Sequence, residues 1–269
     1  MIIVGNAFDE LVDLEPESIQ SIVTSPPYYG LRDYGVDGQL GLEESPIDYV
    51  ENLVSIFNLA KTSLKTNGTL WVNIGDTYFN KGLLGIPWRF AFGMQDWGWT
   101  LRQDIIWHKT NPLPEPVKDR CVKAHEYVFL FTKSEKYYFD TEAIKEKEKR
   151  VAGKGNFFGG KKYGNDDAKI HSYKSGNEYK GCGLANKRSV WSTAVSCSSE
   201  AHCAPFPKAL IRPCILAGTD YGDTVLDPFL GSGTTAQVCI EEGRKWIGIE
   251  LNPDYAKIAE KNTQQLGLF

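Results

Sequence analysis

The sequence has no long apolar run. None of its stretches approaches the roughly 20 apolar residues that a membrane-spanning helix needs. The N-terminus also lacks the charged and apolar regions of a secretory signal peptide. These absences argue against an integral membrane protein and lead us to expect a cytoplasmic one. The composition is an ordinary globular one, and 269 residues are enough for one large core or two modest ones.

The cysteines lack the spacing of a metal site. No Cys-x-x-Cys pair occurs, so we expect neither a zinc site nor, in a reducing cytosol, a disulfide. We therefore predict that no metal takes part in the function. The six cysteines are Cys121, Cys182, Cys197, Cys203, Cys214 and Cys239.

The chain has no overall excess of positive charge. Its net charge is −4 at pH 7 and its pI about 5.7, which argues against nonspecific nucleic-acid binding over the whole surface. Residues 142–188 are an exception to the overall negative charge, because they hold twelve basic side chains and six acidic ones. This segment is either a solvated loop or a surface that contacts phosphate groups.

Short apolar runs alternate with helical patterns along most of the chain. Apolar spacing predicts helices over 46–65, 86–98 and 206–218, the last with a glycine stop at Gly218. The alternation predicts an α/β fold with a mostly parallel sheet. Residues 150–183 have little apolar periodicity and are interpreted as an insert rather than a second full domain. The predicted strands lie within 1–7, 18–28, 66–76, 100–111, 124–134, 223–227 and 245–250. Regular pattern also returns over 188–193, after the insert.

A glycine-rich turn, "TVLDPFLGSGTT", follows one of the last predicted strands. Gly231 and Gly233 let the backbone turn tightly and approach a ligand closely. Asp227 before the turn would repel a pyrophosphate, whereas Glu250, about 23 positions later, suits ribose hydroxyls. A ligand with an ammonium group, a ribose and no phosphate fits this pattern, and S-adenosylmethionine (SAM) has those parts. The alternative is a turn that merely needs glycine.

A second unusual stretch, "VTSPPYYG", ends an early apolar run. Its two adjacent prolines forbid a regular helix and remove two backbone N–H donors. Two tyrosines and a glycine follow at once. By itself this stretch is equally compatible with a structural turn and with a site.

Together the two stretches resemble the SAM-dependent DNA methyltransferases that modify exocyclic amino groups. "TSPPY" (24–28) matches their catalytic motif, Ser/Asp/Asn-Pro-Pro-aromatic, and "DPFLGSGTT" (227–235) matches their cofactor motif. "GIELNPDYAKIAEKN" (248–262) resembles their ribose-binding strand and the helix after it. The resemblance covers nearly the whole chain except about 142–187. It implies a Rossmann-like SAM-dependent methyltransferase fold, with helices on both faces of the sheet.

The order of the motifs resembles the permuted beta group of this family, in which the catalytic motif comes first and a variable DNA-reading region follows. The resemblance then implies a catalytic part over 1–141 and a basic target-recognition insert over 142–187. The SAM-binding part of the same domain would span 188–269. The opening "IIVGNAF" would be the third strand of the cofactor half.

The resemblance also implies roles for individual residues. The expected catalytic residues are Ser25, Pro26, Pro27 and Tyr28. The expected SAM-binding residues are Asn6, Ala7, Asp227, Pro228, Phe229, Gly231, Gly233, Thr234, Thr235, Glu250 and Asn252. The expected DNA-binding residues are Lys161, Lys162 and Arg188.

The chemistry of an exocyclic amine explains the proline turn. The nitrogen lone pair is delocalised into the ring, and acceptors for the amine hydrogens make the nitrogen more tetrahedral. We assign this role to the Pro26 carbonyl and the Ser25 side chain. The target base must leave the duplex to be reached, and Tyr28 would stack on it, which is worth roughly 1–3 kcal/mol.

The first motif residue bears on the choice of base. By resemblance, Ser25 favours N4 of cytosine over N6 of adenine. Both bases place an amine beside a ring acceptor, so the chemistry of a serine hydroxyl leaves adenine open.

Several further alternatives stay open at this level. The substrate is double-stranded DNA in our preferred interpretation, with RNA or a protein amide as the alternative, and a non-catalytic binding module as a third. The enzyme is either the partner of a restriction endonuclease or solitary, and either a monomer or a homodimer. Asp76 either borders the base pocket or caps a turn, and Lys109 faces either DNA or solvent.

Overall fold

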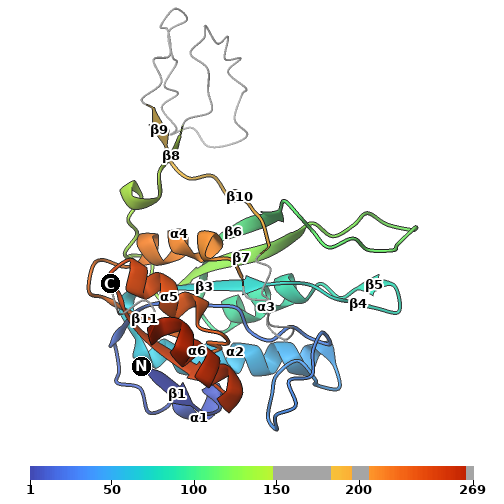
Figure 1. Cartoon of the computed structure of the whole chain (residues 1–269), viewed down its shortest axis with the longest axis horizontal. Coiled ribbons are helices and arrows are strands. Elements are labelled where there is room, and N and C mark those ends of the chain that lie inside the picture. Colours follow the sequence, from blue (N-terminus) through green and yellow to red (C-terminus); the bar gives the residue numbers. More distant parts are fainter. Residues whose placement is uncertain (148–182, 196–205, 265–269) are drawn as a thin grey trace, which may run out of the picture.

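A computed structural model of the chain describes residues 1–147, 183–195 and 206–264. Its centre is a sheet of eight strands in the order β1-β12-β11-β2-β3-β7-β6-β10 (Figure 1). Every strand predicted from the sequence is present in this sheet. The strands of the sheet are β1 Ile2–Val4, β2 Ile19–Thr24, β3 Leu64–Ile74, β6 Thr100–Lys109, β7 His125–Thr132, β10 Val190–Thr193, β11 Thr224–Asp227 and β12 Lys245–Glu250.

The sheet is mostly parallel, as predicted. Among its eight strands only β7 runs antiparallel to its neighbours, β3 and β6. All other adjacent pairs are parallel. The opening strand β1 lies at one edge and pairs with β12, with Ile3 opposite Ile249, so it belongs to the half of the sheet that carries the glycine-rich turn. The expected Rossmann-like methyltransferase fold is confirmed.

Helices cover both faces of the sheet (Figure 1). α1, α2 and α3 share one apolar core with one face, and α4 and α5 share a second core with the other. α6 packs against α5, β1 and β12. Their bounds are α1 Ala7–Glu10, α2 Pro46–Ser63, α3 Ile86–Asp96, α4 Lys208–Gly218, α5 Thr234–Glu241 and α6 Pro253–Gln264, and a short 3₁₀ turn spans Glu142–Ile144.

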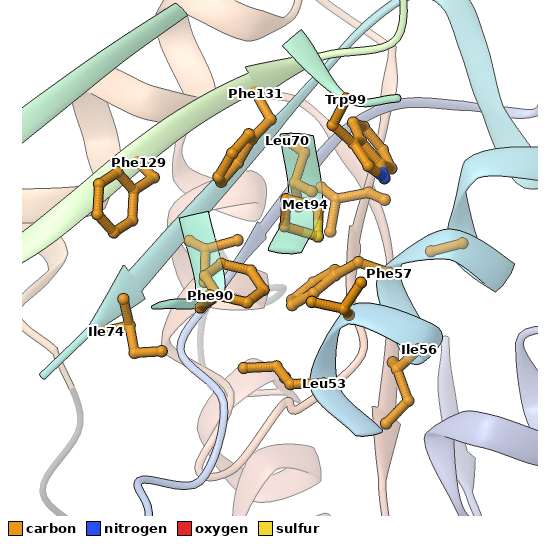
Figure 2. Packing of buried hydrophobic residues seen from close by; sticks show 14 of the residues in the cluster. Leu53, Ile56, Phe57, Leu70, Ile74, Phe90, Met94, Trp99, Phe129 and Phe131 are labelled. Atoms are coloured by element: carbon orange, nitrogen blue, oxygen red, sulfur yellow. The ribbon is translucent and has the colours of Figure 1, made fainter. Parts of the chain in front are cut away.

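The larger core is built from aromatic rings. Figure 2 shows Phe57 of α2 and Phe90 of α3 facing Phe131 of β7. The ring centroids of Phe57 and Phe90 are 5.6 Å apart, and those of Phe90 and Phe131 are 5.8 Å apart. Tilted and edge-on pairs of this kind add about 0.5–1.5 kcal/mol each beyond their buried area. Ile22 of β2 and Ile74 of β3 belong to the same core, so the strands that lead into the proline turn and the Gly75 loop are packed against it.

The predicted helices form, and α4 ends at Gly218, as expected. Gly218 itself keeps helical geometry. A Cβ atom there would lie 2.6 Å from Thr69 Oγ1 and 2.9 Å from Ser21 Oγ. The position therefore needs glycine because the helix end approaches two strands closely, and not because of an unusual φ angle.

Two small antiparallel pairs extend from the main body. β4 (Tyr78–Phe79) and β5 (Gly82–Leu83) form a hairpin, and β8 (Glu146–Lys147) pairs with β9 (Leu184–Ala185). The second pair joins the two ends of the predicted insert. Most of that insert, residues 148–182, lies outside the described residues.

The two motif loops begin at one edge of the sheet. β2 ends directly before the proline turn, and its neighbour β11 ends at Asp227 before the glycine-rich turn. Because these strands are parallel, their carboxyl ends lie together, which is where open α/β sheets bind ligands. None of the helices in the described part of the chain is long and apolar enough to cross a membrane.

Candidate active site

One cavity of about 870 Å³ lies at this edge and is lined by both motifs. All four expected catalytic residues line it. Residues from the two ends of the chain, about 200 positions apart, therefore share one pocket. The expected SAM-binding residues that line it are Asn6, Ala7, Asp227, Pro228, Phe229, Gly231, Thr234, Glu250 and Asn252.

The glycine-rich turn is closed by Glu250. Its carboxylate accepts hydrogen bonds from Gly231 N at 2.7 Å and from Asn252 N at 2.8 Å. Burial raises the pKa of this carboxyl above its usual value, and the two backbone donors lower it. A carboxylate has about four acceptor sites, so Glu250 keeps capacity for further donors such as hydroxyl groups.

Gly233 does not line the cavity, although it was expected to bind the cofactor. Its φ is +87°, and a Cβ there would lie 3.1 Å from the Cβ of Ala259 in α6. The glycine lets α5 start in close contact with α6. A direct cofactor contact at Gly233 stays a prediction.

Asp227 fastens the catalytic strand to the glycine-rich turn. Its side chain is 2% exposed. Oδ1 accepts hydrogen bonds from Thr24 Oγ1 at 2.6 Å and Phe229 N at 3.1 Å, and Oδ2 accepts one from Thr235 Oγ1 at 2.6 Å. Thr235 is buried and does not line the cavity, so its visible role is to hold Asp227. Burial raises the pKa of Asp227 to about 6, and the three donors oppose this shift.

The proline turn is held from behind by a tyrosine. Tyr49 of α2 donates a hydrogen bond to the Pro27 carbonyl at 2.8 Å, while Pro26 is buried. Ser25 Oγ lies 3.5 Å from the Tyr28 hydroxyl. The chain direction through the turn is therefore fixed, and the Ser25 and Tyr28 side chains stand at the cavity wall.

Tyr28 is anchored by a buried polar cluster that we call the tyrosine anchor, made of Asn73, Lys109 and Glu126. The Tyr28 hydroxyl donates to Glu126 Oε2 at 2.7 Å, and Asn73 Nδ2 donates to the same oxygen at 3.2 Å. Lys109 forms an ion pair with Glu126 Oε1. Burial and the Glu126 charge raise the pKa of Tyr28 well above its usual range, so its hydroxyl stays a donor.

The ring of Tyr28 also needs a glycine beside it. A Cβ at Gly75 would lie 2.6 Å from Tyr28 Cε2. The sequence analysis missed Glu126, Asn73 and Gly75 as site residues. The available signal was that Glu126 is the one charged residue in the otherwise apolar run 126–131, where a strand buries its side chains.

The structure places the two polar residues whose roles were left open. Asp76 caps the start of α3, where its carboxylate accepts from Gly85 N and Ile86 N at 3.0 Å each, and it also lines the cavity. Lys109 turns toward Glu126 and the cavity, with its side chain 21% exposed. A contact of either residue with a base or with DNA stays a prediction.

Asn6 begins α1 at the end of β1. Its side chain accepts from Phe8 N at 2.9 Å and donates to the Gly38 carbonyl at 3.4 Å. It thereby ties the 30–45 loop to the cofactor half of the cavity. The expected SAM-binding role of Asn6 stays a prediction.

Of the three expected DNA-binding residues, only Arg188 lies in the described part of the chain. Lys161 and Lys162 lie outside the described residues. Arg188 is exposed and forms an ion pair with Glu146, next to the β8–β9 pair. Its role toward DNA stays a prediction.

The cavity residues fit SAM by their chemistry. Asp227 and Glu250 supply acceptors. Phe229 supplies an aromatic ring, whose centroid lies 6.3 Å from that of Phe57. Asn6 brings an amide to the same wall. Acceptors for ammonium and ribose hydroxyls, a flat apolar wall and an amide are the groups that the parts of SAM require.

Comparisons with known proteins agree with this site. A family model described as DNA methylase matches residues 19–261. Type II methyltransferase M.Cfr9I of Citrobacter freundii is 44% identical over 97% of this chain and 86% of its own length. Type II methyltransferase M.SmaI of Serratia marcescens is 41% identical over 97% and 89%.

Solved structures show the same fold. The PvuII DNA methyltransferase (cytosine-N4-specific) matches with a TM-score of 0.73 and 23% identity, over 99% of this chain and 89% of its own. The M1.HpyAVI–SAM complex matches with a TM-score of 0.58 and 21% identity, over 97% and 98%. On the family match and the two close relatives, this chain belongs to the DNA methylase family of N4- and N6-directed amino-methyltransferases.

Proposed function

We propose that this enzyme transfers a methyl group from SAM to the exocyclic N4 amine of cytosine in duplex DNA. The observation that carries the proposal is the single cavity lined by both Ser25–Tyr28 and the Asp227–Gly231 turn. A methyl donor and an acceptor amine must meet within a few ångströms, and one shared cavity permits this. When bound, SAM supplies an electrophilic methyl group.

The chain's own residues prepare the acceptor. The Pro26 carbonyl and Ser25 Oγ accept hydrogen bonds from the amine hydrogens, in a turn that Tyr49 holds rigid through the Pro27 carbonyl. Tyr28 stacks on the flipped base, with its hydroxyl fixed by Glu126. Because Ser25 and Tyr28 come from one short turn, the base is positioned by one rigid unit.

SAM itself would be held by the cofactor half of the cavity. Glu250 would accept from the ribose hydroxyls, Asn6 would approach the adenine ring, and Asp227 would attract the cationic amino acid part. Asp227 already accepts three hydrogen bonds from the chain, so its contribution is chiefly its charge and the placement of the turn.

The preference for cytosine rests on Ser25. Serine at this motif position resembles the N4-cytosine enzymes, and the structural neighbour with a TM-score of 0.73 is named as cytosine-N4-specific. N6 of adenine is the alternative, because both amines stand beside a ring acceptor.

We also propose that DNA approaches through the basic insert. Residues 142–187 would read the target, between a catalytic part over 1–141 and a SAM-binding part over 188–269. Arg188 stands at the base of this insert, beside β8–β9. The relatives are named Type II methyltransferases, which supports a restriction endonuclease as the functional partner.

Nucleoside mass spectrometry tests the proposal. Unmodified phage DNA is incubated with the protein and SAM, then digested and analysed, with Ser25→Ala as the control variant. N4-methylcytosine from the wild-type protein and a strongly reduced yield from Ser25→Ala are expected. N6-methyladenine instead would refute the choice of base and keep the reaction class. Neither product, with SAM bound, would refute DNA as the substrate and direct the search to RNA or protein amides.

A further inference from the structure

Two projections stand together beside the cavity. The β4–β5 hairpin and the β6–β7 connection, residues 110–124, extend to the same side of the molecule (Figure 1). The Arg120 guanidinium lies 4.0 Å from the ring centre of Tyr78, and Lys81 pairs with Asp119 at 3.2 Å. These contacts join the hairpin and the connection into one unit.

Leu113 is the most exposed large apolar side chain in the described part of the chain. It is 81% exposed, yet it lines the same cavity as Ser25 and Tyr28. Single exposed leucines are common on protein surfaces, but this one borders the pocket that holds the catalytic turn, and covering it would be worth up to about 1.5–3 kcal/mol.

The backbone around Leu113 is stiff. Pro112 and Pro114 flank it, and each proline fixes its own φ and restricts the residue before it. The connection is also braced. Glu115 pairs with Arg120 at 2.5 Å, and Lys123 donates through its side chain to the Asp76 carbonyl. The prolines and these contacts therefore restrict the conformations of the loop that places Leu113 at the mouth of the cavity.

The charge around Leu113 favours a nucleic acid as the partner. The hairpin and residues 112–124 carry four basic side chains and two acidic ones, Glu115 and Asp119, in a protein of net charge −4. A local excess of cations attracts a phosphate backbone. The basic side chains are Lys81, Lys118, Arg120 and Lys123.

We propose that Leu113 is an apolar wedge that enters the base stack beside the target and occupies the space left by the flipped base. Apolar side chains can insert between base steps, partly unstack them and kink the duplex, and an inserted side chain fills apolar space that the flipped base leaves. This inference rests on the proposed function, because only a flipped base requires a wedge next to the Ser25–Tyr28 turn. It assigns to the 112–114 segment a role in opening the duplex rather than in reading the sequence.

The test compares two duplexes that differ in the cost of flipping. The target site is first mapped by sequencing the DNA that the wild-type protein methylates. One synthetic duplex carries the site fully paired, and the other carries the target base opposite a mismatch, which is cheaper to flip. The variants are Leu113→Ala, the apolar replacement Leu113→Met and the control Val12→Ala. Val12 is 67% exposed and does not line the cavity.

We expect Leu113→Ala to lower kcat/KM by about tenfold or more on the paired duplex and by about twofold or less on the mismatched one. Leu113→Met and Val12→Ala should stay near wild type on both, and SAM affinity should not change. An equal loss on both duplexes, or no loss on either, would overturn the wedge. A wild-type protein that methylates no DNA would instead refute the proposed function.

Discussion

The Tyr28 hydroxyl donates a hydrogen bond of 2.7 Å to Glu126, a residue 98 positions away in the sequence. Glu126 is 8% exposed and pairs with Lys109 from the adjacent strand β6. A hydrogen bond to a buried charge is stronger than one between neutral groups. Glu126 is therefore a positioning residue, which fixes the ring that we expect to stack on the base.

The first prediction concerns this hydrogen bond. Tyr28→Phe and Glu126→Gln should each lower kcat by about ten- to a hundredfold, because a hydrogen bond to a charged group is worth about 1.5–3 kcal/mol. The double variant should be little slower than either single variant, since Tyr28→Phe removes the donor and Glu126→Gln the charge on the acceptor of the same hydrogen bond. Single-turnover methylation measures the rate, and calorimetric SAM binding shows whether the cofactor half of the cavity is intact.

Stability needs a separate control in that series. Glu126→Gln leaves the partly buried Lys109 without its carboxylate, and a charge that loses its partner in such a place destabilises the fold. Lys109→Met combined with Glu126→Gln removes both charges. If this double variant regains both stability and full turnover, Glu126 serves only as a structural partner of Lys109 and does not position Tyr28.

The second prediction separates the two halves of the cavity. Tyr28→Ala should leave SAM affinity within about twofold and lower methyl transfer by at least about fivefold, because base stacking is worth roughly 1–3 kcal/mol. Equilibrium SAM binding and initial rates measure these effects. Full activity in Tyr28→Ala would contradict the stacking role.

The third prediction concerns the link between the motifs. Asp227→Ala should abolish detectable SAM binding, because it removes a charge and frees Thr24, Thr235 and Phe229 N together. Asp13→Ala, at an exposed site, is the control. Retained SAM affinity in a folded Asp227→Ala protein would refute the cofactor role of this carboxylate.

The fourth prediction follows from the pKa of Asp227, which burial raises from 3.8 to about 6. Between these pH values the native state binds the proton more readily than the unfolded chain. The free energy of unfolding therefore falls by about 3 kcal/mol as the pH rises from about 4 to about 6, because Asp227 ionises less readily in the native state. Asp227→Asn cannot ionise and should lack this decrease.

Urea unfolding over that pH range measures the difference. The unfolding free energy of Asp227→Asn minus that of the wild type should rise with pH. Burial also raises the pKa of Glu250 in both proteins, so the difference keeps only the part of that shift that the Asp227 charge causes. A difference that is independent of pH would contradict the prediction.

The fifth prediction concerns the insert. Replacing Lys161 and Lys162 with Gln should weaken DNA binding. The slope of the logarithm of the DNA-binding constant against the logarithm of the salt concentration should become shallower by about one for each phosphate that these lysines contact in the wild type. Titrations of labelled duplex DNA at several salt concentrations give this slope. An unchanged slope would count against phosphate binding by these lysines.

Much of the fold and half of the site could be read from local patterns. Alternation of short apolar runs with helical spacing predicted seven of the eight strands of the sheet, all but β10, because burial of one face imposes a period along the chain. The proline turn and the glycine-rich turn were also local, since each depends on the backbone limits of its own residues.

The remaining features depend on register and on distant contacts. Glu126 meets Tyr28 only because β7 runs antiparallel between β3 and β6, which places its first residues beside the ends of both. Gly218 is needed because Thr69 and Ser21 approach it, and no local pattern carries that information. The sequence by itself determined the elements and the two motifs. The tertiary structure decided which buried polar and charged side chains hold the motifs in place. The reason is that such contacts depend on strand order and packing rather than on neighbours along the chain.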